Sequence, residues 1–74
     1  MKILLLNPNT TSEVTDLLYA AGHRAASAGT ELAAVTAKRG VPYIATRAEA
    51  QIGGAIALEM LAEAGDGFDA AIIA

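Results

Sequence analysis

Three short apolar runs, separated by two longer stretches of helical periodicity, constrain the fold of this chain more than any other feature. The runs are Ile3–Leu6, Leu32–Thr36 and Phe68–Ala74. Continuous apolar runs of this length are typical of strands buried on both faces, as in parallel sheets. Strands that alternate with amphipathic helices indicate right-handed crossovers on such a sheet. We therefore predict an α/β fold with three layers, α/β/α, in the order strand, helix, strand, helix, strand.

The two stretches between the runs carry the start signals of helices. Thr10 is followed three residues later by Glu13, and Thr46 by Glu49, so each pair predicts a capping box with the threonine as N-cap. Apolar residues at helical spacing then predict the faces that pack on the sheet, and a glycine is expected to end each helix. For the first helix the face is Val14, Leu17, Leu18, Ala21, Ala25 and Ala28, ending at Gly29; for the second it is Ile52, Ala55, Ile56 and Met60, ending at Gly65.

The hydrophobic core available to this fold is thin. Hydrophobic residues make up 54% of the 74 positions, but 18 residues are alanine, and no cysteine is present to form a disulfide. Domains of this size bury only about 60% of the surface that their unfolded chains expose. The third run also ends at Ala74 with no helix to cover it. We expect residues 1–74 to be the N-terminal part of a longer α/β protein, and we expect that protein to be a homo-oligomer.

Charge and composition exclude several classes of function. The formal net charge is -3, and Lys38-Arg39 is the main cationic cluster, so the chain lacks the basic stripe that nucleic-acid binding requires. A single histidine and no cysteine cannot form a zinc site. The first apolar run is too short for a signal peptide, and no stretch approaches the length of a membrane span. We expect a cytoplasmic protein with no nucleic-acid or membrane partner.

The richest candidate site is the loop that follows the first predicted strand. Open α/β sheets bind ligands at the carboxyl ends of their strands. Here Asn7-Pro8-Asn9-Thr10-Thr11 presents two amides and two hydroxyls directly before a helix N-terminus, which favours an anion such as a carboxylate. The alternative is that these residues only form an Asx turn and an N-cap. The glycines of a nucleotide-binding loop are absent.

Other polar residues offer weaker candidates. Tyr43 and Arg47 fall near the same edge of the predicted sheet and could touch a substrate. His23 falls in the middle of the first helix and is expected at the surface, and Glu49 is explained by its capping role. Gly53 lies inside the second helix with Gly54, where the pair indicates close packing and not a phosphate cradle.

The two ends of the chain resemble the Asp/Glu/hydantoin racemase family, with the hydantoin racemase branch the most similar. The resemblance lies in Lys2–Thr11, with its Asn-Pro-Asn-Thr-Thr loop, and in Phe68–Ala74; Pro42–Glu49 is similar in place and spacing. It spans the whole chain but about a third of a family protein. It implies that this chain is half of a flavodoxin-like domain, the N-terminal part of a two-domain fold with the active site between the domains.

The resemblance also implies a chemistry. Family members invert a carbon acid without a cofactor, using two cysteines on opposite faces of the substrate. The first cysteine is expected just after Ala74 and the second in the other domain, so neither is present here and the 74-residue piece alone is expected to be inactive. The substrate would be a hydantoin, allantoin or a related amino-acid derivative carrying a carboxylate or ring carbonyl. The substrate-binding residues would be Asn7, Pro8, Asn9, Thr10, Thr11 and Tyr43.

Two alternatives to a racemase stay open at the level of sequence. A sibling activity of the same superfamily, such as isomerisation or decarboxylation of a small diacid, would use the same loop. A non-catalytic module would instead use the loop to bind a small anion, or the open sheet edge to bind a partner chain.

Overall fold

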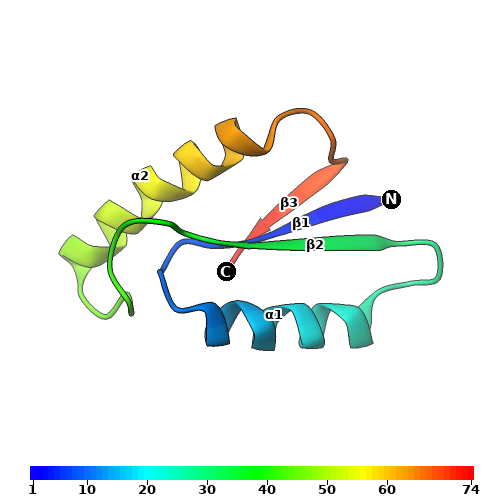
Figure 1. The fold of residues 1–74 in the computed structure, drawn as a ribbon, viewed down its shortest axis with the longest axis horizontal. Coiled ribbons are helices and arrows are strands. Elements are labelled where there is room, and N and C mark those ends of the chain that lie inside the picture. Colours follow the sequence, from blue (N-terminus) through cyan, green and yellow to red (C-terminus); the bar gives the residue numbers. More distant parts are fainter.

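The apolar runs form the three strands of one parallel sheet. The computed structural model describes all residues, 1–74. Its elements follow the predicted order and are drawn in Figure 1. They are β1 (Lys2–Asn7), α1 (Ser12–Ala25), β2 (Glu31–Thr36), α2 (Arg47–Ala64) and β3 (Ala70–Ile73).

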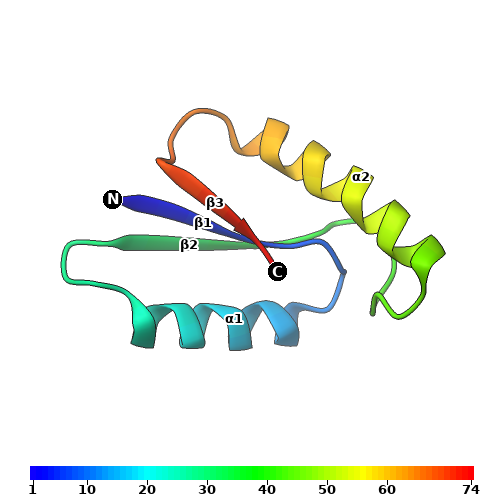
Figure 2. The same ribbon diagram turned by 180° about the vertical axis from the view of Figure 1, so that it is seen from behind.

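The first strand lies in the middle of the sheet. The strand order is β2-β1-β3, and both pairings are parallel, with Leu4 opposite Ala33 on one side and Ala71 on the other. The helices lie on opposite sides of the sheet, α1 on one and α2 on the other (Figures 1 and 2). The predicted α/β fold with three layers is therefore confirmed.

The core lies between β1 and α2. Leu4 and Leu6 are almost fully buried and pack with Ala57 of α2, and Met60 and Phe68 pack against the edge of this cluster. Only 10 of the 74 residues are buried, so the core is as thin as the alanine content predicts. The side chains of β3 are exposed throughout.

Helix α1 faces the sheet with smaller residues than predicted. Leu17, placed on the packed face by its spacing, is 71% exposed, while Thr15 is buried. A Cβ atom at Gly22 would lie 2.9 Å from Leu5 Cδ1 and 3.2 Å from Leu32 Cδ1. The missing side chain therefore lets the helix approach the sheet closely. Of the predicted face, Val14 and Leu18 are half-buried, Ala21 and Ala25 are exposed, and Ala28 lies beyond the end of the helix.

The predicted ends of α1 are wrong at both termini. The N-cap is Thr11 and not Thr10, and its side chain makes no capping hydrogen bond; the Thr11 hydroxyl donates to the Pro42 carbonyl. The helix ends at Ala25, and Gly29, with a φ of 86°, lies in the turn before β2. The third strand is likewise shorter than the apolar run that predicted it.

Helix α2 begins and ends as predicted, although its packed face differs. Thr46 Oγ1 accepts from the Glu49 amide, and the Glu49 carboxylate accepts from the Thr46 amide at 3.0 Å. The pKa of Glu49 is lowered from its ordinary value, chiefly by the hydrogen bond from the Ala45 amide and then by the hydrogen bonds with Thr46. Gly65 is the C-cap. Of the predicted face, Ile56 is buried and Met60 is half-buried, but Ile52 is 47% exposed and Ala55 is also exposed. Gly53 is buried instead, and a Cβ there would lie 2.6 Å from Ile44 Cδ1.

Neither helix is both long and apolar enough to cross a membrane.

Substituting one threonine at the start of each helix tests which of them caps its helix with a side chain. Thr46→Ala removes a side-chain cap and should lower the free energy of unfolding by about 1 kcal/mol, whereas Thr10→Ala removes no cap and should change it by less than about 0.5 kcal/mol. Urea unfolding of the full-length protein, followed by circular dichroism, measures both. A larger loss for Thr10→Ala than for Thr46→Ala would contradict the assigned caps.

Candidate functional site

Hydrogen bonds join the two loops at the carboxyl end of the sheet. The Thr10 amide donates to the Val41 carbonyl at 3.0 Å, and the Thr11 hydroxyl donates to the Pro42 carbonyl at 2.6 Å. The Ala37 amide is shared between the carbonyls of Asn7 and Asn9. The predicted site residues of the first loop are thus brought together with the segment that leads to Tyr43.

The Asn7 side chain is the centre of the first loop. It is 1% exposed, and its Nδ2 donates to Asn9 Oδ1 at 2.9 Å and to Thr15 Oγ1 at 3.0 Å, with the Thr11 carbonyl 3.2 Å away. Its Oδ1 accepts from the Asn9 amide at 3.2 Å. Every polar atom of this side chain is therefore engaged within the chain.

Asn9 has one engaged and one unengaged side-chain atom. Its Oδ1 accepts from Asn7 Nδ2 and from the Thr11 amide, the second at 2.9 Å, while its Nδ2 makes no hydrogen bond within the chain. The Thr10 hydroxyl, on the same half-buried loop, is also without a partner. The loop therefore turns its acceptor oxygens inward and keeps a primary amide and a hydroxyl available as donors.

The start of α1 adds backbone donors to this set. Because Thr11 does not cap the helix, the amides of Ser12 and Glu13 donate to no other group of the chain. Free amides at a helix N-terminus attract negative charge, because the peptide dipoles of the helix point their positive ends there. Together with Asn9 Nδ2 and the Thr10 hydroxyl, these amides can bind the oxygens of a carboxylate, a ring carbonyl or an enolate.

The other residues weighed in the sequence analysis make no polar contact with this set. Pro8 is buried, with its ring toward Gly53. Tyr43 follows the Pro42 carbonyl that anchors Thr11, and its side chain is 64% exposed. Arg47 is exposed at the start of α2 and forms no ion pair. His23 is exposed on α1, as expected, and its ring meets the Tyr19 ring edge-on.

The end of β3 reaches the same edge of the sheet. The Ala74 amide donates to the Leu6 carbonyl at 3.0 Å, one residue before Asn7. Ile73 is the strand partner of Leu6, so Ala74 comes level with Asn7. In this register, a residue that followed Ala74 would leave the sheet beside the first loop.

Two polar residues of this region were missed by the sequence analysis. Thr15 of α1 and Thr36 of β2 join their hydroxyls at 2.6 Å beneath the loop, where Thr15 also receives the bond from Asn7. In the sequence, Thr36 appears only as a threonine at the end of an apolar run, and Thr15 only as a threonine in the first turn of a helix. Neither signal shows that the two hydroxyls meet.

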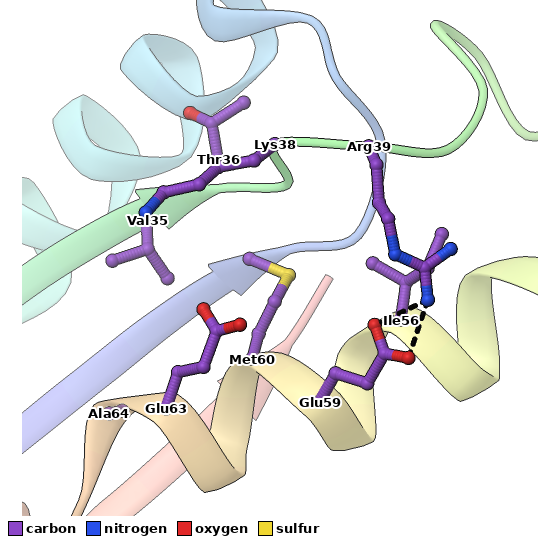
Figure 3. Close-up of a pocket in the computed structure, with 9 residues that line it drawn as sticks. All are labelled: Val35, Thr36, Lys38, Arg39, Ile56, Glu59, Met60, Glu63 and Ala64. Carbon is purple, nitrogen blue, oxygen red and sulfur yellow. Dashed lines mark hydrogen bonds and ion pairs between the residues drawn. The ribbon is translucent and has the colours of Figure 1, made fainter.

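A hollow of about 400 Å³ lies elsewhere, between β2 and α2. Figure 3 shows Val35, Ile56 and Met60 along it, with Arg39 and Glu59 joined as an ion pair at its rim. Both charged side chains are largely exposed. No group of three His, Cys, Asp or Glu side chains in the chain could hold a metal ion.

Among the comparisons with known proteins, the search of solved structures finds a match. No protein-family model matches the chain, and no curated protein matches it. Among solved structures, the chain is similar to the crystal structure of an allantoin racemase from Pseudomonas fluorescens, with a TM-score of 0.94 and 28% identity. The match covers 100% of this chain and 32% of the racemase chain. The chain therefore has a racemase-like fold and spans about a third of the length of that neighbour.

Proposed function

We propose that this chain is the N-terminal part of a cofactor-independent racemase, and that its first loop holds the oxygens of the substrate. The observation that carries the proposal is the match of all 74 residues to an allantoin racemase at a TM-score of 0.94. The substrate class is allantoin, a hydantoin or a related amino-acid derivative. The proposal concerns the whole protein, because the match covers 32% of the racemase chain.

The donors of the site suit the difficult step of this chemistry. Racemisation removes a proton from the carbon next to a carbonyl, and the electron pair of that C–H bond moves onto the carbonyl oxygen as an enolate. A proton then adds to the carbon from the opposite face. Donors placed where the negative charge develops stabilise this intermediate. Asn9 Nδ2, the Thr10 hydroxyl and the free amides of α1 are such donors.

The proton-transfer groups lie outside this chain in the proposed mechanism. The first loop carries amides and hydroxyls, none of which exchanges a proton readily near neutral pH. The family resemblance assigns this role to two cysteines, and the first would follow Ala74. The register of β3 would bring that thiol beside Asn7 and Pro8. A thiol has an ordinary pKa of about 8.5, and the N-terminus of α1 would lower it toward neutrality.

Racemisation can be measured directly on the full-length protein. With one enantiomer of allantoin in D₂O, the optical rotation should fall to zero while deuterium enters at the stereocentre, because proton removal and return occur on opposite faces. A heat-inactivated sample corrects for spontaneous racemisation. Unchanged rotation with both allantoin and hydantoin substrates would contradict the proposed function, and release of CO₂ from a diacid would point to the sibling activity.

Asn9→Asp tests the donor role of the loop. The carboxylate keeps oxygens that can accept from Asn7 and Thr11, but replaces the free NH₂ group by a negative charge facing the substrate oxygen. Removal of one such donor typically costs about 100-fold to 1000-fold in turnover, so kcat/KM should fall by at least about 100-fold. Gln51→Glu is the matched control, because it makes the same amide-to-carboxylate change at an exposed position of α2, and it should stay within about threefold of the wild type. Wild-type activity in Asn9→Asp would remove Asn9 from the site.

A further inference from the structure

A threonine buried between α1 and the sheet has a role that packing alone does not explain. Thr15 is 7% exposed and lies four residues after the N-cap of α1, on the side that faces β1 and β2. Its hydroxyl is bonded on two sides, to Asn7 Nδ2 at 3.0 Å and to Thr36 Oγ1 at 2.6 Å. A valine would fill the same space without bringing a polar group into the core.

The buried bond from Asn7 to Thr15 anchors the Asn7 amide in its orientation. A primary amide has two hydrogens on nitrogen and none on oxygen, so its orientation follows from its partners. The Thr11 carbonyl, which can only accept, and the Asn9 backbone amide, which can only donate, select the orientation of the Asn7 amide. The Thr15 hydroxyl accepts from the same Asn7 nitrogen and anchors the amide in that orientation. Of the bonds that Asn7 Nδ2 makes, the one to Thr15 is the buried one, where water competes least.

The orientation of Asn7 in turn sets what the loop offers to a ligand. With its nitrogen fixed, Asn7 donates to Asn9 Oδ1, which also receives the Thr11 amide. The Asn9 oxygen is therefore held inward and its NH₂ group is left free. If the Asn7 amide moved, the Asn9 oxygen would be held by the Thr11 amide alone, and the Asn9 NH₂ group would be less firmly fixed toward the ligand.

We propose that Thr15 is a positioning residue of the site: through Asn7 it holds Asn9 with its NH₂ group toward the ligand, so that the loop selects carbonyl and carboxylate oxygens. This inference rests on the proposed function and deepens it. Thr15 itself makes no contact with the ligand. Thr36 supports the Thr15 hydroxyl from β2 without touching Asn7.

Two substitutions at Thr15 separate positioning from packing. Thr15→Val keeps the volume and removes the hydroxyl; Thr15→Ser keeps the hydroxyl and removes a methyl group. If Thr15 positions Asn9, Thr15→Val should lower kcat/KM for allantoin in the full-length protein by about tenfold, the value of one hydrogen bond. Thr15→Ser should restore kcat/KM to within about threefold of the wild type, even though it loses packing. Thr36→Val, the control, should also stay within about threefold.

A purely structural role gives the opposite pattern. The melting temperature would then fall in Thr15→Ser, which loses the methyl group, and stay close to the wild type in Thr15→Val. The kcat/KM measured well below the melting temperature would be the same in both variants and the wild type. That result would overturn the inference while leaving the racemase proposal intact.

A second measurement decides the inference without relying on activity. In ¹⁵N-labelled full-length protein, Thr15→Val should move the side-chain NH₂ resonances of both Asn7 and Asn9 and speed their exchange with water, and Thr15→Ser should not. Unchanged Asn9 resonances in Thr15→Val would overturn the inference even in a protein that racemises nothing. Absence of racemisation together with shifted Asn9 resonances would reject the proposed function and keep the positioning role.

Discussion

The carboxyl end of this sheet depends on the hydrogen bonds made by the buried side-chain amide of Asn7. A strand that ends in the centre of a parallel sheet leaves polar backbone groups that need partners, and a buried group without one is costly. Asn7 meets this need at the end of β1 by binding the loop that follows it and the first turn of α1. Its backbone carbonyl also accepts from Ala37 at the end of β2. One residue therefore fixes the relative positions of β1, α1 and β2 where the candidate site forms.

Glycines at the contacts between elements let the two helices and the second loop pack closely around the end of β1. Gly22 brings α1 onto Leu5 and Leu32, and Gly53 brings α2 under the second loop. Gly40 has a φ of 125°, and a Cβ there would lie 2.6 Å from Ile56 Cδ1, so the second loop also passes close to α2. These contacts hold the two loops together over a core of few large side chains. The result is a site of backbone and amide donors on closely packed elements.

The continuous apolar runs predicted the strands, their alternation with helices predicted the parallel sheet, and the spacing of Thr46 and Glu49 predicted the capping box, because each of these patterns is local in sequence. The start of α1 was predicted one residue too early, at Thr10, because the Thr10 amide bonds to the Val41 carbonyl and the Thr11 hydroxyl to the Pro42 carbonyl, and such contacts between distant residues leave no local pattern. The packed face of α1 was predicted only in part, because Val14 and Leu18 are half-buried but Leu17 is exposed, and Thr15 and Gly22 were not included in that face. The loop residues were identified as a group from sequence. The division between Asn7, which is engaged within the chain, and Asn9, which keeps a free amide, appears only when the hydrogen bonds are seen.

The central claim is that the first loop and the start of α1 bind the oxygens of the substrate. Titration of ¹⁵N-labelled full-length protein with allantoin, followed by two-dimensional NMR, tests it most directly. The account predicts saturable shifts at the Asn9 side-chain amide and at the backbone amides of Ser12 and Glu13, because these donors are free in the structure. Saturable shifts confined to the hollow between β2 and α2, around Val35 and Met60, would contradict it.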